Sequence, residues 1–177
     1  MTVSDEALAA RAAQGDAAAF DALVRAHTDR MYRVALRVCG DPADAEDVVQ
    51  DAWIAAWRGL SGFRGEAKVS TWLYRVVSNT AVAHLRRRRP TASLTGVEVV
   101  DQGPTPEGQA LLRERAAAVH RAIAGLEPGQ RVPLVLREFE GLSYAEVAEV
   151  LGVEVTVLHR RLHRARVALL AKLRELR

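Results

Sequence analysis

A segment rich in proline and glycine divides this chain of 177 residues into two parts. Three prolines and three glycines lie between residues 90 and 108, and the apolar residues there do not recur at helical spacing. Such a composition is typical of a flexible linker, because neither residue type supports the interior of a helix or strand. We therefore expect two small domains, residues 1–89 and 109–177, joined by a linker at 90–108.

Both parts are predicted to be helical. Hydrophobic residues make up 49% of the chain but aromatic residues only 5%, and the dominance of alanine, leucine and valine favours packed helices over a β-sandwich. In the first part, Asp16 and the Asp41–Pro42 pair are typical helix starts. Ser70 or Thr71 is expected to open a further helix that ends in four arginines. The predicted fold class is all-α.

Charged residues are concentrated in three places, although the net charge is only +3. Residues 41–51 contain five acids and no base, residues 86–89 are all arginine, and residues 158–177 contain seven bases and one acid. The helix that begins at Asp41 is expected to carry three of these acids on its polar side, namely Asp44, Asp47 and Asp51. One acidic and two basic surfaces indicate a cationic partner and a polyanionic one. The alternative is that these charges are solvated helix faces without a partner.

The C-terminal part contains the pattern of a helix-turn-helix. Ser143 and Glu146 form a capping box for a short helix, and Gly152 is placed for the left-handed turn that ends it. The next helix is strongly basic outside its apolar face, which includes Leu158 and Leu162. An ordinary αα-hairpin with a charged outer face shares this spacing. The capping box, the turn glycine and the density of arginine together favour DNA binding.

Neither an active site nor a metal site is expected. His159 and His163 are four residues apart, as metal-binding histidines can be, but no acid or third ligand accompanies them. The sequence contains no glycine-rich phosphate loop and no nucleophile elbow, so we expect neither an enzyme nor a cofactor. The single cysteine, Cys39, cannot form an internal disulfide. Residues 1–6 do not resemble a secretory signal and no apolar run approaches about eighteen residues, which predicts a soluble cytoplasmic protein.

Three segments resemble the extracytoplasmic-function (ECF) sigma factors, which give bacterial RNA polymerase its promoter specificity. They are DAEDVVQDAW at 44–53, GFRGEAKVSTWLYRVVSNTAVAHLRRRR at 62–89, and GLSYAEVAEVLGV followed by RLHRAR between 141 and 166. They occur in the order and spacing of that family and together span nearly the whole chain. The resemblance implies a protein that binds core polymerase and recognises the minus-ten and minus-thirty-five promoter elements. The alternatives are a free-standing helix-turn-helix regulator and an interaction protein that does not initiate transcription.

The resemblance also implies roles for individual residues. The helix that docks on the clamp helices of the polymerase's largest subunit matches here at Asp47, Gln50 and Asp51, with Trp53 and Trp57 anchoring its other face. Contact with the minus-ten element, both duplex and melted, is expected from Phe63, Arg64, Lys68, Ser70, Thr71, Trp72, Arg75, Asn79, Arg86 and Arg87. Contact with the minus-thirty-five element is expected from His159, Arg160, Arg161, His163 and Arg164.

The recognition segment departs from the usual family pattern. The family's Gly-Thr-Val-Lys-Ser is here Thr156-Val157-Leu158-His159-Arg160. Histidine in place of a longer base, and arginine in place of serine, change which base edges can be contacted. The DNA-binding role is therefore expected, but the family's usual target sequence is not carried over to this chain. The resemblance further implies an anti-sigma factor as a partner.

Overall fold

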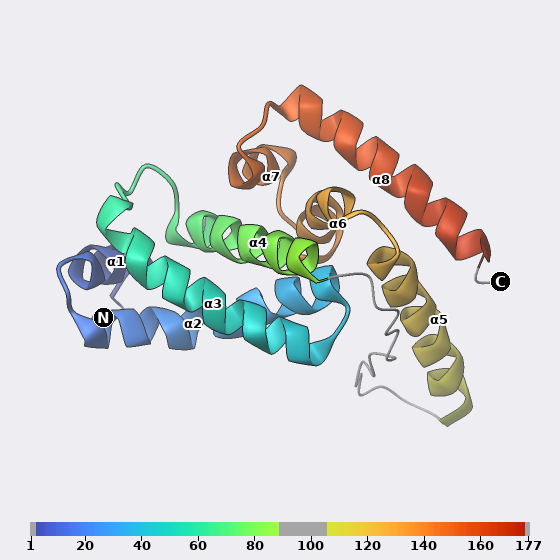
Figure 1. Ribbon diagram of the computed structural model, residues 1–177, viewed down its shortest axis with the longest axis horizontal. Coiled ribbons are helices and arrows are strands. Elements are labelled where there is room, and N and C mark those ends of the chain that lie inside the picture. Colours follow the sequence, from blue (N-terminus) through green and yellow to red (C-terminus); the bar gives the residue numbers. More distant parts are fainter. Residues whose placement is uncertain (1–2, 89–105, 176–177) are drawn as a thin grey trace.

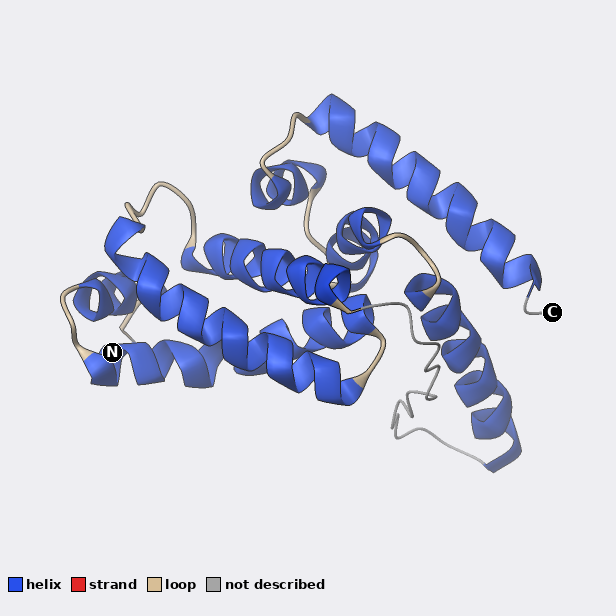
Figure 2. Ribbon diagram, viewed as in Figure 1, coloured by secondary structure: helices blue, strands red, loops and turns tan. Residues whose placement is uncertain are grey.

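The computed structural model describes residues 3–88 and 106–175, and all of its regular elements within those ranges are helical (Figures 1 and 2). The first part contains α1 (Asp5–Ala13), α2 (Ala17–Cys39), α3 (Pro42–Gly59), the short 3₁₀ turn η1 (Leu60–Gly62) and α4 (Val69–Arg87). The second contains α5 (Pro106–Ala124), α6 (Pro128–Leu134), the π-helical turn η2 (Val135–Phe139), α7 (Tyr144–Leu151) and α8 (Val155–Glu175). The all-α prediction is confirmed. The predicted linker lies outside the described residues up to residue 105, and α5 begins at Pro106.

Local capping chemistry sets most of the helix starts in the first part. The Asp16 carboxylate accepts a hydrogen bond from Ala19 N at 3.1 Å, and that of Asp41 accepts one from Asp44 N at 3.0 Å. Both predicted starts are therefore confirmed. The start of α4 differs from the prediction, because the helix begins at Val69 and its cap residue, Lys68, makes no side-chain cap bond.

Sequence inspection missed α1, whose helical character rests on few residues. Ser4 caps it by accepting from Ala7 N at 3.2 Å, and Ala9 and Ala12 are its buried side chains. Alanine faces give little amphipathic contrast, so the pattern is weak in a sequence. The helix is attached to α2 by a 2.8 Å contact between Asp5 Oδ2 and His27 Nε2.

Helices α2, α3 and α4 pack side by side around the core of the first part (Figure 1). Leu23 and Met31 on α2, Val48 on α3 and Val77 on α4 are buried in this core. Trp53 is buried as expected, and its indole N–H donates to Thr28 Oγ1 at 3.0 Å. Trp57 differs from the expectation: it is 43% exposed, because it lies at the edge of the bundle, where its ring contacts Phe20.

The second part contains the predicted helix-turn-helix in α7 and α8. Both hydrogen bonds of the Ser143–Glu146 capping box are present, and Gly152 ends α7 with φ +62°. Pro133, inside α6, lacks an N–H donor, and the regular α-helix ends one residue later in the π-helical turn. On α8, Leu158 and Leu162 are fully buried.

The two parts pack against each other. Helix α4 contacts α6 and α7, while α2 contacts α5, α6 and η2. Helix α8 packs on α5, α6 and α7, on their side away from α4 (Figure 1). The buried apolar side chains of both parts form one continuous cluster. Among residues 3–88 and 106–175, no helix combines the length and apolar composition of a membrane span.

Candidate nucleic-acid interface

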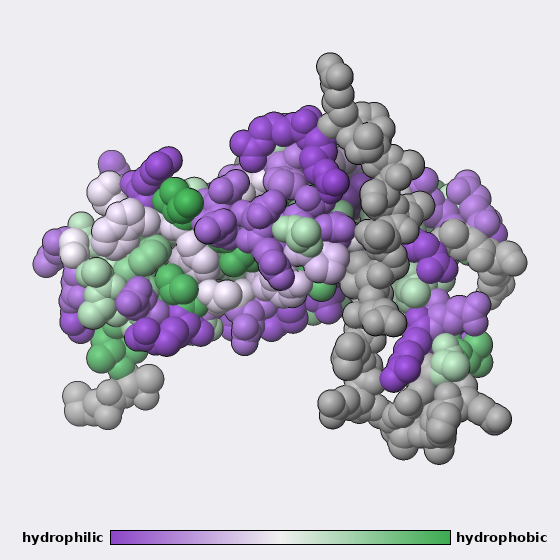
Figure 3. Space-filling view, turned by 60° about the horizontal axis from the view of Figure 1, so that its bottom comes forward, coloured by the Kyte–Doolittle hydropathy of each residue, from purple (hydrophilic) through white to green (hydrophobic). Residues whose placement is uncertain are grey.

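The exposed acidic residues of α3 share their side of the helix with one apolar side chain. Asp47, Gln50 and Asp51 are all exposed, as the sequence predicted for a docking surface. Ile54, three residues after Asp51 and four after Gln50, continues the same face and is 45% exposed. Sequence reasoning missed it, although the register that places Asp47 and Asp51 on the polar side of this helix also places Ile54 there. On the face drawn in Figure 3, scattered hydrophobic side chains similarly interrupt a mainly hydrophilic surface. We call these four residues the acidic face.

Asp44 does not belong to the acidic face, contrary to the prediction. It is 8% exposed, and its Oδ1 lies 3.0 Å from His84 Nε2 near the end of α4. The guanidinium of Arg88 also pairs with this carboxylate. A carboxylate this buried is stabilised only by such partners, so Asp44 joins α3 to α4 and is withdrawn from any partner protein.

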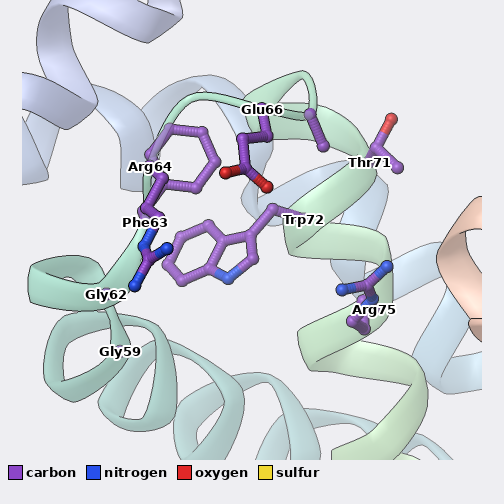
Figure 4. Close-up of a pocket in the computed structure, with 9 residues that line it drawn as sticks. Gly59, Gly62, Phe63, Arg64, Glu66, Thr71, Trp72 and Arg75 are labelled. Atoms are coloured by element: carbon purple, nitrogen blue, oxygen red, sulfur yellow. The ribbon is translucent and has the colours of Figure 1, made fainter.

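A pocket of about 280 Å³ lies between the loop that follows α3 and the first turns of α4 (Figure 4). The rings of Phe63 and Trp72 lie 5.3 Å apart at 45° and form an aromatic wall. The remaining lining comes from Gly59, Gly62, Arg64, Glu66, Ala67, Thr71 and Arg75. The volume lies at the lower limit of small-molecule pockets, about 300 Å³, which suits one planar ring system.

Five of the predicted minus-ten residues meet in this pocket: Phe63, Arg64, Thr71, Trp72 and Arg75. The other five do not line it. Lys68, Asn79, Arg86 and Arg87 are exposed and Ser70 is half-buried. Glu66 was not predicted, yet its carboxylate points into the pocket beside Trp72 (Figure 4). The pocket therefore combines π faces, cations and one carboxylate.

The predicted minus-thirty-five residues lie on the outer side of α8. His159, Arg160, Arg161, His163 and Arg164 are all exposed. The buried positions of Leu158 and Leu162 place them there, because the apolar stripe of α8 faces α6 and α7. Together these five residues form one basic surface that contains no acidic residue.

Tyr144, at the start of α7, holds one of these residues in a defined orientation. Its ring stacks on that of His159 with centroids 4.4 Å apart and an interplanar angle of 24°. The guanidinium of Arg137 lies 4.8 Å from the Tyr144 ring centroid. Arg166 donates to the Tyr144 hydroxyl at 3.5 Å, which lowers the pKa of that hydroxyl, and also pairs with Glu138 at 2.5 Å. Tyr144 is thus fixed on several sides.

Burial makes the single cysteine unreactive. Cys39 ends α2 at 9% exposure, and desolvation raises the pKa of its thiol to about 12. Because the thiolate is the reactive form, we expect native protein at neutral pH to react with a disulfide reagent about a thousandfold more slowly than protein unfolded in urea. The reaction should also show no inflection near pH 8.5. Native labelling as fast as unfolded labelling would contradict this placement of Cys39.

Two family models match this chain, one in each of its two parts. The family model for sigma-70 region 2 matches residues 23–91, and that for sigma-70 region 4 matches residues 116–169. The chain is 39% identical to the RNA polymerase sigma-H factor of Pseudomonas aeruginosa over 176 residues, covering 93% of this chain and 91% of that protein. It is 40% identical to the ECF sigma factor SigM of Mycobacterium tuberculosis over 168 residues, covering 94% and 83%. The chain belongs to the ECF sigma factor family.

The solved structures give the same result for this ECF sigma factor. CnrH, in complex with the cytosolic domain of CnrY, superposes with a TM-score of 0.70 at 32% identity, covering 97% of each chain. The region 2 match contains the acidic face and the pocket, and the region 4 match contains α7 and the exposed basic residues of α8 from His159 to Arg164. A free-standing helix-turn-helix regulator would not account for the region 2 match. Sigma factors are transcription initiation factors, and this chain directs promoter-specific initiation by RNA polymerase.

Proposed function

We propose that this ECF sigma factor divides its work among three separate surfaces. The acidic face of α3 binds core RNA polymerase, the pocket beside α4 captures a base of the melted minus-ten element, and the outer side of α8 binds the minus-thirty-five duplex. The observation that carries this assignment is the separation of charge: the exposed acids of α3, an aromatic and cationic pocket beside α4, and the basic outer side of α8 are distinct surfaces. The polymerase supplies the chemistry, so the sigma factor itself needs no active site. We place its action in the cytoplasm, where polymerase and chromosome meet.

The acidic face suits a helical partner rich in arginine. Carboxylates at Asp47 and Asp51 can accept charge-assisted hydrogen bonds, and the amide of Gln50 can both donate and accept. Ile54 adds an apolar contact at the edge of the charged patch, where burial contributes affinity that charge alone does not. The clamp helices of the polymerase's largest subunit are the proposed partner.

The pocket suits a nucleobase that has left the stack. Phe63 and Trp72 offer faces on which a base can stack, a contact worth roughly 1–3 kcal/mol per base. Arg64 at the rim offers a positive charge to the backbone. The Glu66 carboxylate can accept a hydrogen bond from an exocyclic amino group, which favours a base that carries one. Outside the pocket, exposed Asn79, Arg86 and Arg87 extend the path along α4.

Arg160 and Arg164 lie one turn apart on α8, and we expect both to contact phosphates of the minus-thirty-five duplex. Changing either to alanine should weaken duplex binding and reduce the slope of log K against log[salt] by about 0.9, the contribution of one phosphate contact. The measurement is a titration of duplex promoter DNA at several salt concentrations. Arg174→Ala, an exposed base at the far end of the same helix, is the matched control and should leave the slope unchanged. Wild-type slopes for both Arg160→Ala and Arg164→Ala would refute the phosphate contacts.

The Tyr144 ring should determine base preference through His159. In Tyr144→Leu the stack is lost, and we expect the preference at the base pair that His159 contacts to fall by about three- to tenfold. Tyr144→Phe keeps the stack but lacks the hydroxyl, so it should retain the preference. Selection from a duplex pool randomised across the minus-thirty-five element measures this, with His159→Ala as the reference for a lost contact. If Tyr144→Leu selects the wild-type sequence, His159 does not depend on Tyr144.

We also propose an anti-sigma factor as a regulatory partner. The support is that CnrH, which covers this chain over nearly its whole length, was solved bound to the cytosolic domain of CnrY.

Binding to core polymerase distinguishes the proposed sigma factor from a DNA-binding regulator that acts without polymerase. The full chain, mixed with core enzyme and passed through a size-exclusion column, should elute with it in equal amounts without DNA. A chain that binds promoter duplex yet elutes apart from core enzyme would support the regulator instead.

A further inference from the structure

A buried carboxylate connects the two parts of the chain. Glu140, just after η2, has a side chain only 3% exposed. Its carboxylate accepts a hydrogen bond from the Tyr74 hydroxyl at 3.1 Å and lies 3.3 Å from Arg33 Nη2 and 3.4 Å from Arg37 Nη1. All three partners belong to the first part of the chain, on α2 and α4. A buried charge is tolerated only when it is paired and hydrogen-bonded, so the closed arrangement both buries Glu140 and supplies the partners that its burial requires.

Arg75 makes a second connection, and it does so with a group that the pocket also uses. Its Nε donates to Val150 O at 3.2 Å and its Nη2 donates to Glu149 O at 2.5 Å. These carbonyls lie in the last turn of α7, where helix carbonyls carry partial negative charge, and that of Glu149 also accepts from Gly152 N at 3.2 Å. Arg75 also lines the pocket. The same guanidinium cannot bind the end of α7 and the DNA backbone at once.

Two further contacts reinforce this arrangement. The guanidinium of Arg37 lies 4.9 Å from the ring centroid of Phe139, next to Glu140. Arg131 on α6 donates to Val38 O near the end of α2 at 2.7 Å and to Leu126 O within its own part at 2.6 Å. The interface between the two parts is therefore polar and charged as well as apolar.

We propose that Glu140 and its three partners form an intramolecular latch that holds this sigma factor closed, with Arg75 withheld from promoter DNA. We call Glu140, Tyr74, Arg33 and Arg37 the latch. This inference rests on the proposed function, because it concerns when the pocket and α8 can act on the same promoter. Release of the latch frees Arg75 and allows the two parts to separate.

The dimensions of the promoter favour an opening. The minus-ten and minus-thirty-five elements are roughly 25 base pairs apart, and at about 3.4 Å per base pair this is about 85 Å of duplex. A compact chain of this length has a radius of gyration of about 16 Å. Because α8 packs on α6 and α7, which in turn contact α4, the closed form cannot place α8 and the pocket on the two elements together.

Energy transfer between two dyes measures the opening without polymerase or DNA. Cysteines at the exposed positions Glu46 and Ala171 carry the dyes in a full-length chain whose buried Cys39 is alanine. Glu140→Gln removes the buried charge while keeping the shape of the side chain. We expect it to raise the ratio of open to closed molecules about tenfold, the effect of losing charge-assisted hydrogen bonds. Glu138→Gln is the matched control, since Glu138 lies in the same segment but pairs with Arg166 within the second part.

Tyr74→Phe is the second latch variant. It keeps the ring in the core and removes only the hydroxyl that donates to Glu140, so it should open the protein in the same direction by a smaller factor. It also covers the case in which Glu140→Gln fails to fold, which circular dichroism would show. If energy transfer in the folded latch variants equals that of Glu138→Gln, the latch does not exist.

A DNA-binding measurement distinguishes the case in which the proposed latch is wrong from the case in which the proposed base-binding pocket is wrong. Short single-stranded DNA of random sequence should bind Glu140→Gln several-fold more tightly than it binds the Glu138→Gln control, because Arg75 is released. If energy transfer shows that Glu140→Gln opens but DNA binding is no tighter, the latch is supported and the competition for Arg75 is refuted. Tighter DNA binding without opening would refute the latch while supporting the pocket.

Discussion

Replacing Asp47 and Asp51 together with lysine is expected to lower the affinity for core RNA polymerase at least about a hundredfold and to abolish promoter-dependent transcription. Each substitution turns an attraction for a cationic helix into a repulsion, and close charge pairs across interfaces are coupled by roughly 1.5–7 kcal/mol. Both side chains are exposed, so the fold should not change. Binding of fluorescently labelled sigma factor to core enzyme measures the affinity, and run-off transcription measures the consequence.

Glu46→Lys is the matched control for this pair. Glu46 is an exposed acid on the same helix, but it lies outside the acidic face. The contact between Asp51 and Arg87, at 3.9 Å between exposed groups, contributes little stability. A double variant that folds, binds core enzyme with wild-type affinity and transcribes normally would remove the acidic face from the docking site.

Phe63→Ala should have the second-largest effect. Phe63 is half-buried and forms one side of the aromatic wall with Trp72, so the substitution removes a stacking surface worth roughly 1–3 kcal/mol. We expect binding of single-stranded minus-ten DNA by the holoenzyme to fall about ten- to a hundredfold, and promoter opening with it. Permanganate footprinting of melted thymines measures the opening.

A conservative variant and a second binding measurement test whether the effect of Phe63→Ala is specific to the pocket. Phe63→Tyr preserves the aromatic face and should restore opening, whereas binding of duplex minus-thirty-five DNA should be equal in all three proteins. Normal opening by Phe63→Ala would show that the pocket holds no base. Loss of duplex binding together with opening would point to a folding defect instead.

Several helix ends were predictable because their chemistry is local, although the start of α4 and the Ser4 cap of α1 were not among them. Asp16, the Asp41–Pro42 pair, Ser143 with Glu146, and Gly152 each act on backbone groups within a few residues, and the structure confirms all of them. The exposed positions of the basic residues on α8 were also predictable. The apolar stripe of α8 determines which side of the helix faces the core, and the basic residues lie on the other side.

Residues with distant partners could not be placed from the sequence. Periodicity put Asp44 on the polar side of its helix, yet its partner His84 is 40 residues away and buries it. Glu140 and Tyr74 are separated by 66 residues, and Arg75 and Val150 by 75. No helical pattern encodes these contacts, because they depend on how helices pack. The pocket was half predicted: the resemblance supplied Phe63 and Trp72, but only packing showed that Glu66 joins them.

Run-off transcription with core polymerase and a promoter library tests the central claim most directly. Core enzyme alone should give no specific transcripts, and adding this protein should produce transcripts from templates that share one upstream and one downstream element. If core enzyme gives the same products with and without the protein across the whole library, the assignment of its three surfaces is wrong.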